Sequence, residues 1–224
     1  MGYGALRIQA TKGIYLGFAP VLFGFVSLPH LFIIQGPSMM PTLLDGDYVL
    51  ARSTNSSEAL PRGPVVIYHR PRAEGAADVK RIVGVAGDRI QMAGGALHLN
   101  GQPVARERTG DFVAGASPGR VGPVKRWRET LADDVSYETL DLVEAGASDE
   151  TPLQIVPAGH YFVLGDNRDN SRDSRMAQVG PIPAGSIIGR GAIIVFSIDR
   201  NASIWEPWRW PLEVRWSRLL NRVR

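Results

Sequence analysis

The hydrophobic and polar positions divide the chain into one long apolar run followed by many short ones. From 13 to 34 there are 22 residues without Asp, Glu, Lys or Arg. A helix needs about 20 such residues to cross the hydrocarbon core of a bilayer. The pattern therefore predicts a transmembrane anchor at 13–34, preceded by a short segment at 1–12 that carries Arg7 and Lys12 and no acid.

A cleavable signal peptide or a buried core helix is the alternative to an anchor. Signal peptides have a shorter apolar region, about 7–15 residues, which ends in a small-x-small cleavage site. No such site follows Ile34. The basic residues before the run predict a cytoplasmic N-terminus, which leaves everything after Gln35 on the outer side of the membrane.

Beyond the anchor, the apolar runs are short and rich in β-branched and aromatic residues, as is typical of strands. The 25 glycines and 16 prolines of the 224 residues also favour strands and turns over helix bundles. The predicted core strands are 48–51, 63–70, 79–85, 160–164 and 186–198.

The composition shifts in the middle of the chain. Turn signals at 93–95 and 100–101 lie between short alternating runs and predict tight β-hairpins. Residues 106–136 are charged and weakly periodic, so we expect them to be rich in loops. Residues 137–143 alternate as a half-buried strand does.

These patterns predict a mostly β fold preceded by one transmembrane helix. We expect an antiparallel-sheet core in two parts, 35–88 and 159–200, with an inserted smaller β subdomain at 89–158. The core is followed by a Trp/Arg-rich amphipathic tail at 201–224, the C-terminal tail.

The C-terminal tail contains four of the five tryptophans. Five of its apolar residues fall on one face of a helix, which are Leu212, Trp216, Leu219, Leu220 and Val223. Trp and Arg in this arrangement suit a bilayer interface with anionic lipid. A helix packed on the protein's own body, or a dimer face, explains the pattern equally well.

Composition and charge exclude several function classes. A net charge of +3 is too small to indicate nucleic-acid binding, and no basic block is combined with a stacking platform. Because the chain has no cysteine, it has no disulfide, thiolate chemistry or thiolate ligation. We expect no cofactor and no metal.

Ser38 lies in an unusual setting, between Pro37 and Pro41, four residues after the apolar run ends. Each proline fixes its own φ and pushes the preceding residue toward extended geometry, so the segment cannot be helical. A rigid, extended segment that presents one hydroxyl suits a nucleophile. A proline-rich linker with an incidental serine is the alternative, and the presence of a base decides between them.

Lys80 is the candidate base, because a lysine in an apolar strand can have its pKa lowered toward neutrality by desolvation. A solvated surface charge is the usual role of a lysine at a strand edge. A Ser-His-Asp triad would instead use His69, His98 or His160, but each lies in a predicted strand with no partner spacing that favours it.

Residues 165–175, the acidic loop, combine aspartates and asparagines with three arginines. A calcium loop would need Gly where Ser174 stands and a Glu at its twelfth position. A network of Asp–Arg pairs and side-chain-to-backbone bonds that braces a turn explains the composition better.

Together, four segments resemble the bacterial type I signal peptidase (leader peptidase) family. They follow the predicted anchor in the family's order, as GPSMMPTL at 36–43, GDYVLAR at 46–52, KRIVGVAGD at 80–88 and GDNRDNSRDSR at 165–175. Residues 89–160 match by place and not by motif.

The resemblance implies a Ser-Lys endopeptidase of mostly β fold, with Ser38 as nucleophile and Lys80 as neutral general base. It implies that Ser171 hydrogen-bonds the lysine. The other supporting residues it implies are Arg81, Asp173 and Arg175, and the side chains it places in the substrate pocket are Ile34, Met39 and Leu43.

Gly36 is a departure from some members of the family, which have a serine there whose hydroxyl helps to stabilise the oxyanion. The family accepts glycine at this position, and the oxyanion must then rely on backbone N–H groups, chiefly that of Ser38, or on water. Many members also have two anchors, whereas this chain predicts one.

By the resemblance, the expected substrates are exported preproteins, which lose their N-terminal signal peptides by a cut after small residues (Ala-x-Ala type). Membrane lipid is the other expected partner, and nucleic acid is not. The expected location is the bacterial inner (plasma) membrane, single-pass, with the catalytic domain on the outer (periplasmic or extracytoplasmic) face. A tether there would raise the effective concentration of enzyme and scissile bond.

Two other function classes fit part of the pattern. A self-cleaving Ser-Lys repressor would share the dyad, but it would carry a DNA-binding module in place of an anchor at 1–34. A membrane-anchored β-domain that only binds partners would share the anchor, but it would not need a Pro-flanked serine paired with a lysine. Cleavage of a signal-bearing precursor separates these alternatives.

Overall fold

The computed structural model describes residues 30–54, 58–70, 76–113, 123–143, 145–199, 208 and 210–223. Strands dominate, and the helical elements are single turns. The strands are β1 (His30–Ile33), β2 (Asp47–Ser53), β3 (Val65–His69), β4 (Ala77–Gly84), β5 (Arg89–Ala93), β6 (Ala96–Leu99), β7 (Gln102–Pro103), β8 (Ala105–Phe112), β9 (Val124–Thr130), β10 (Ser136–Asp141), β11 (Gln154–Ile155), β12 (His160–Leu164), β13 (Ile182–Pro183) and β14 (Ile187–Ser197). The helical turns are η1 (Arg168–Asn170), η2 (Ala184–Ser186), α1 (Trp210–Glu213) and η3 (Trp216–Arg218).

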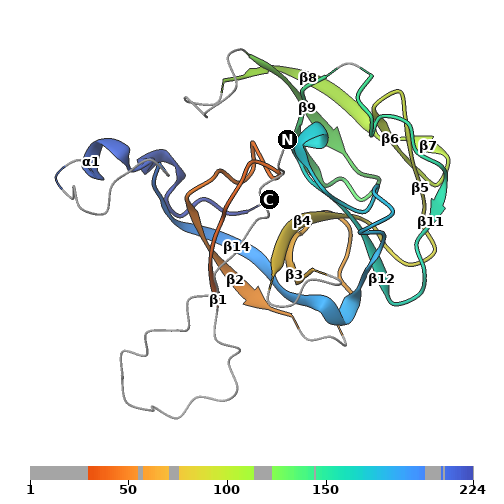
Figure 1. The fold of residues 1–224 in the computed structure, drawn as a ribbon, viewed down its shortest axis with the longest axis horizontal. Helices are drawn as coiled ribbons and strands as arrows, with labels where there is room; N and C mark the ends of the chain where they lie inside the picture. Colours follow the sequence, from red (N-terminus) through yellow and green to blue (C-terminus); the bar gives the residue numbers. More distant parts are fainter. Residues whose placement is uncertain are drawn as a thin grey trace, which may run out of the picture.

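A seven-stranded antiparallel sheet forms the main body, in the order β1-β2-β14-β3-β4-β12-β13 (Figure 1). β14 joins its two halves, because it pairs with β2 along one stretch and with β3 along another. The predicted mostly β, antiparallel fold class is therefore confirmed.

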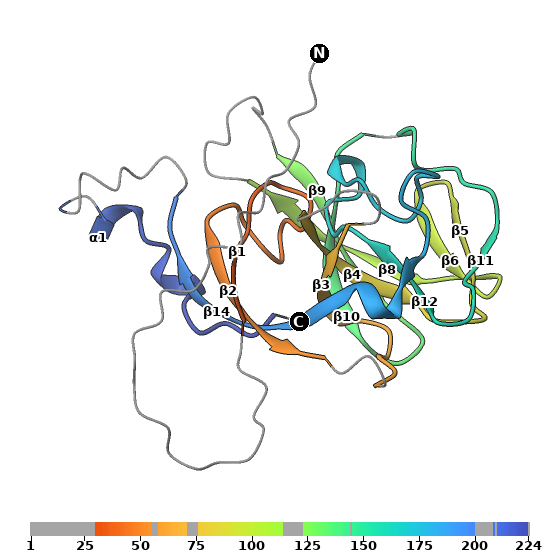
Figure 2. The same ribbon diagram turned by 60° about the horizontal axis from the view of Figure 1, so that its bottom comes forward.

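Two smaller sheets come from residues between β4 and β12, the span in which the sequence predicts an inserted subdomain. One has the order β10-β9-β8 and the other β11-β5-β6-β7. In both views the four-stranded sheet lies at the opposite end of the molecule from α1 (Figures 1 and 2). The expected hairpins are present, with Gly94 and Gly95 at the turn from β5 to β6.

The central strand β3 is buried on both faces, which explains why its sequence is almost continuously apolar. In β3, Val65 and Ile67 pack into one core cluster, while Val66 and Tyr68 pack into a second cluster on the opposite face. Successive side chains of a strand point to opposite faces, so a strand covered on both sides needs apolar residues at every position.

The prediction that 106–136 is rich in loops was wrong for most of its described residues. β8 and β9 form an antiparallel ladder there, with Arg106 opposite Glu129 and Glu107 opposite Arg128. Two of these charges find partners outside the ladder, Arg106 in Asp141 and Glu129 in Arg168, so the strands need no apolar alternation. Because this pairing joins distant residues, periodicity within either strand could not reveal it.

The predicted anchor at 13–34 ends too late. Its residues 13–29 lie outside the described part of the chain, but His30–Ile33 forms strand β1 and pairs with β2. Pro29 cannot donate a helical hydrogen bond, and the aromatic and β-branched Phe32 and Ile33 fit a pleated sheet. Among the helices that the structure describes, none is long and apolar enough to cross a bilayer.

The C-terminal tail does not form the predicted amphipathic helix in its described residues. α1 and η3 are single turns, and Leu220 has a φ of 62°, which a right-handed helix does not allow. The chain pairs instead with β14 and the residue that follows it, through bridges from Arg222 to Ile193 and from Val214 to Ile198. Trp216 and Leu220 remain exposed, so contact of the tail with lipid stays a prediction.

Candidate active site

Residues 35–46, the nucleophile loop, connect β1 to β2 and carry Ser38. The loop is closed at its base by hydrogen bonds from the Ile34 N–H to the Asp47 carbonyl (2.8 Å) and from the Gly46 N–H to the Ile34 carbonyl (3.0 Å). Inside it, the Leu43 N–H donates to the Met39 carbonyl (2.8 Å). Gly36 has a φ of 100°, a backbone conformation that favours glycine.

Lys80 reaches the serine from β4. Its Nζ lies 3.0 Å from Ser38 Oγ, which is hydrogen-bond distance, and it donates a second bond to the Val79 carbonyl (2.9 Å). Lys80 is 3% exposed, whereas Ser38 is partly exposed. A buried amine therefore faces a hydroxyl that solvent or a substrate can reach.

The electrostatic setting of Lys80 favours its neutral form. Burial lowers the pKa of Lys80 below the ordinary value, because the protein interior disfavours the ammonium ion. The Asp78 and Asp173 carboxylates oppose this effect more weakly. Asp78 is itself neutralised by Arg70, which binds both of its oxygens at 2.9 and 2.5 Å.

The acidic loop contacts the backbone on both sides of the serine. The Asn167 N–H donates to the Ser38 carbonyl (3.1 Å), and Asn167 Nδ2 donates to the Pro37 carbonyl (3.0 Å). Gly165 packs so closely here that an added Cβ would lie 2.6 Å from the Ser38 carbonyl oxygen. The two loops therefore fit together only with glycine at 165.

A buried ion pair lies beneath this contact. Arg81, next to Lys80 in sequence, binds Asp166 through Nε (2.8 Å) and Nη2 (2.6 Å), and Thr42 Oγ1 donates to the same carboxylate (2.5 Å). Arg81 is 0% and Asp166 1% exposed. This bidentate geometry ties β4, the acidic loop and the nucleophile loop together.

A second buried pair braces the acidic loop from within. Arg175 binds Asp173 through Nε (2.8 Å) and Nη2 (2.9 Å), and the Gly165 N–H donates to Asp173 Oδ2 (3.0 Å). Burial alone would raise the pKa of Asp173, but the Arg175 guanidinium and these hydrogen bonds outweigh it and hold that pKa below its ordinary value.

The inserted span contributes a third buried pair, which the sequence did not predict. Arg168 binds Glu129 of β9, and the Tyr137 hydroxyl of β10 donates to the same carboxylate (3.1 Å). The Tyr137 ring lies under the Arg81 guanidinium, 4.3 Å from its centre. The Leu140 N–H of β10 also donates to the Asp166 carbonyl (2.8 Å), so this sheet supports the acidic loop directly.

Two expectations from the resemblance differ from the structure. Ser171 is buried beside Gly165, but its hydroxyl makes no hydrogen bond to Lys80. The expected pocket residues lie in the core beneath the serine and present almost no surface, with Ile34 2%, Met39 0% and Leu43 0% exposed. They fill the space under the loop because its turn directs their side chains inward.

The remaining predicted residues and the alternatives can be placed as well. Ser38, Lys80, Arg81, Asp173 and Arg175 belong to one connected group with the acidic loop. The histidines of the alternative triad lie in other elements, His69 in β3, His98 in β6 and His160 in β12. Asp166 and Asn167 were missed as site residues, although their place inside the GDN segment was a signal.

Comparisons with known proteins point to one family. The family model described as "Signal peptidase, peptidase S26" matches residues 7–196. Signal peptidase I of Pseudomonas fluorescens is 30% identical over 206 residues, covering 80% of this chain and 70% of that protein, and the Pseudomonas aeruginosa enzyme gives the same values.

Signal peptidase I of Rickettsia typhi is 27% identical over 194 residues, covering 74% of this chain and 71% of that protein. The family model spans both the nucleophile loop and the acidic loop and ends within β14, so the connected group described above lies wholly inside it. The chain belongs to the S26 family of signal peptidases, hydrolases that remove signal peptides.

Proposed function

We propose that this protein is a membrane-anchored serine endopeptidase that removes N-terminal signal peptides from exported preproteins by Ser-Lys acyl-enzyme chemistry. One observation carries the proposal, the 3.0 Å separation of Lys80 Nζ from Ser38 Oγ with the amine buried and the hydroxyl accessible. A nucleophile and its base within hydrogen-bond reach are the minimum that this chemistry needs.

The base acts in its neutral form. Burial lowers the pKa of Lys80, so the neutral amine is populated closer to physiological pH than that of an exposed lysine. Lys80 accepts the proton of Ser38 as Oγ attacks the scissile carbonyl. The resulting ammonium then gives that proton to the departing amine, which is the N-terminus of the mature protein.

Deacylation reuses the same groups. With the mature protein gone, a water molecule enters and Lys80 accepts its proton as the oxygen attacks the acyl carbonyl on Ser38. The tetrahedral species collapses, the Ser38 oxygen regains a proton from Lys80, and the signal peptide leaves with a free carboxyl group. The enzyme is then restored without a net gain or loss of protons.

The oxyanion of each tetrahedral species needs donors that are fixed in advance. Gly36 has no side chain to donate, so we assign the backbone N–H of Ser38 as the first donor and water or another backbone N–H as the second. The hydrogen bonds from Asn167 to the Pro37 and Ser38 carbonyls support this role, because they fix the orientation of the peptide units around the serine.

Cleavage after small residues and anchoring at the membrane belong to the same proposal. Met39 and Leu43 are buried in the core and present no surface to a substrate, so the Ala-x-Ala preference in this proposal is taken from the resemblance to the family. The apolar run that begins at Gly13 supports an anchor, although Ile33 already lies in β1. Such an anchor would hold Ser38 near the level where a signal peptide ends.

A precursor assay tests the proposal. The full chain in lipid vesicles should cut a precursor with Ala at the first and third positions before the cut, and sequencing of the product should give one mature N-terminus. Ser38→Ala should abolish the reaction, and Phe at either Ala position should block it. Efficient cutting of the Phe precursor would contradict the specificity, and cleavage by Ser38→Ala would contradict the nucleophile.

A further inference from the structure

The C-terminal tail lies beyond residue 196, where the match to the family model ends, yet it binds the back of the nucleophile loop. Its last described residues pair with β14 through the Leu220 N–H to the Ile194 carbonyl (2.7 Å) and the Val223 N–H to the Ala192 carbonyl (3.0 Å). They lie along the part of β14 after Arg190, where β14 no longer pairs with β3 (Figure 1).

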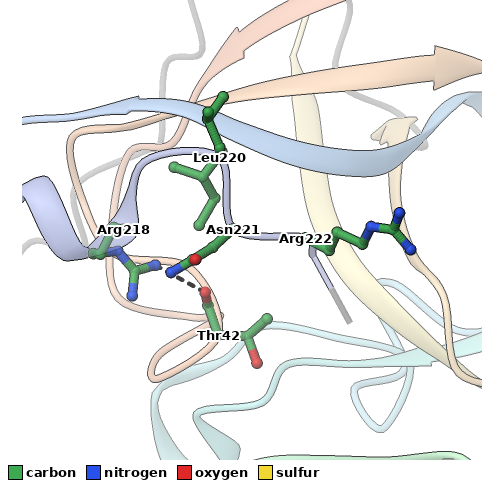
Figure 3. Close-up of a pocket in the computed structure, with 6 residues that line it drawn as sticks. Thr42, Arg218, Leu220, Asn221 and Arg222 are labelled. Carbon is green, nitrogen blue, oxygen red and sulfur yellow. Dashed lines mark hydrogen bonds between the residues drawn. The ribbon is translucent and has the colours of Figure 1, made fainter.

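From this attachment, Arg218 reaches into the loop. Its Nε and Nη2 bind the Asp47 carboxylate at 3.1 and 2.5 Å, and Nη2 also donates to the Thr42 carbonyl (2.9 Å), the contact drawn in Figure 3. Arg215 adds two bonds to the Asp45 carbonyl, both 3.0 Å. Arg215 and Arg218 of the tail therefore bind the second half of the nucleophile loop.

Asp47 supplies the carboxylate that Arg218 binds. Its carboxylate is 0% exposed and accepts from the Leu44 N–H (2.8 Å) and the Ser197 hydroxyl (2.6 Å) as well as from Arg218. A buried carboxylate is costly unless it is paired with a cation and hydrogen-bonded. Arg218 supplies most of that pairing, since Arg215 is 3.7 Å from Asp47.

Thr42 links the tail to the catalytic group. Arg218 holds its carbonyl, while its hydroxyl donates to Asp166, the partner of Arg81. Thr42 is four residues from Ser38 in the same short loop. A shift of Thr42 would therefore displace Ser38 in its own loop and Asp166 in the acidic loop.

We infer that Arg218 is a positioning residue that fixes the nucleophile loop, and with it Ser38, from outside the region shared with the family model. The inference rests on the proposed function for its effect on catalysis. Its structural part, that Arg218 orders the loop, can be tested without any activity.

A pocket next to the guanidinium makes a direct test feasible. It has a volume of about 420 Å³, opens to solvent and is lined by Thr42, Ile194, Arg218, Leu220, Asn221 and Arg222. A small cation can therefore enter the space that a shortened side chain would leave. Arg222 is a matched control, because it lies on the same tail and its guanidinium points away from Thr42 (Figure 3).

The experiment compares Arg218→Ala with Arg222→Ala in the full chain. Misplacement of a nucleophile by about 1 Å can cost about 100-fold in rate. We expect Arg218→Ala to lower kcat by roughly 10- to 100-fold with little change in KM, and millimolar methylguanidine to restore at least part of kcat. Arg222→Ala should keep the wild-type kcat and gain nothing from methylguanidine.

Hydrogen exchange separates this inference from the proposed function. The peptide covering 38–47 should exchange faster in Arg218→Ala than in the wild type and Arg222→Ala, because Asp47, the acceptor of the Leu44 N–H, loses its cation and the Thr42 carbonyl loses its donor. This result supports the ordering role even if no precursor is cut. Unchanged exchange in Arg218→Ala overturns the inference, and so does a fall in kcat that methylguanidine does not reverse.

Discussion

The two loops that meet at Ser38 are stabilised in opposite ways. The nucleophile loop is shaped by hydrogen bonds within its own backbone and by Met39 and Leu43, which pack into the core below. The acidic loop is held by buried ion pairs, which connect it to Arg81 and to Glu129, 85 and 39 residues from their partners in sequence. The nucleophile loop therefore takes its shape from its own backbone and the core, and Arg218 holds its second half from outside, whereas the acidic loop is fixed mainly by buried charges.

This difference separates catalysis from stability. Ser38 and Lys80 form no ion pair with each other, so their removal should affect the reaction and leave the fold in place. The Arg–Asp pairs touch no reacting atom in the proposed mechanism, but loss of one partner leaves a buried charge without compensation.

Removal of either member of the dyad should have the largest effect. We expect Ser38→Ala and Lys80→Ala each to lower kcat/KM by about 10⁴-fold or more, and the double variant to be no worse, because residues that act as one unit are not additive. Thermal unfolding of Ser38→Ala should match the wild type. A double variant much slower than both single variants would contradict a shared unit.

Loss of a buried ion pair should mainly lower the stability of the fold. Asp166→Asn leaves the Arg81 guanidinium buried without its carboxylate, and we expect the free energy of unfolding to fall by about 3–5 kcal/mol. Denaturant unfolding measures this directly, with activity recorded at the same time. A variant that kept wild-type stability while losing activity would show that Asp166 acts in the chemistry and is not a structural support.

The contact between the two loops should be sensitive to a single methyl group. In Gly165→Ala the new Cβ would lie 2.6 Å from the Ser38 carbonyl oxygen and even closer to Ser171 Oγ. We expect a loss of about 1–3 kcal/mol in stability, as is usual for overpacking, and a larger loss in kcat because Ser38 must move. Gly185→Ala is the control, since a Cβ there would meet nothing within 4 Å.

An exposed ion pair should matter least. Arg108 and Asp111 form a 2.5 Å pair in β8 with side chains 47% and 45% exposed. Solvent screens such pairs, so Asp111→Asn should change the free energy of unfolding by about 0–1 kcal/mol. A loss comparable with that of Asp166→Asn would mean that burial is not what distinguishes the two pairs.

The core strands could be predicted from the sequence because each carries its own signal. Runs of β-branched and aromatic residues coincide with β2, β3, β4, β12 and β14, and these predictions are confirmed. β8 and β9 have no such run, since they are rich in charged residues and their ladder joins distant parts of the chain. The helix predicted for the tail was wrong for a similar reason, because the tail pairs with β14 through a long-range contact.

The residues of the candidate site also differ in whether the local sequence marks them. The proline bracket of Ser38 and the apolar neighbours of Lys80 are local features, and they led directly to two side chains 3.0 Å apart. Glu129, Tyr137 and Arg218 have no local feature that marks them, because their importance comes from partners elsewhere in the chain. The expected pocket residues Ile34, Met39 and Leu43 are buried, and the resemblance could not indicate how deeply.

The lowered pKa of Lys80 has two consequences for pH dependence. The neutral amine needed for catalysis is lost as pH falls, so activity should be weak in acid. The fold disfavours the charged amine, which costs stability in full below the folded pKa of Lys80. This cost disappears as pH rises toward the unfolded pKa of about 10.4. Activity should therefore increase with pH through the lowered pKa.

The pH dependence of kcat/KM for the wild-type chain on a signal-bearing precursor tests directly whether neutral Lys80 is the base for Ser38. Circular dichroism at each pH should confirm that the protein is folded. We expect kcat/KM to rise tenfold per pH unit below a single pKa and to level off above it, with that pKa below the ordinary lysine value of about 10.4. A rate that is flat or falls from mildly acidic to mildly alkaline pH, in the folded protein, would contradict this expectation.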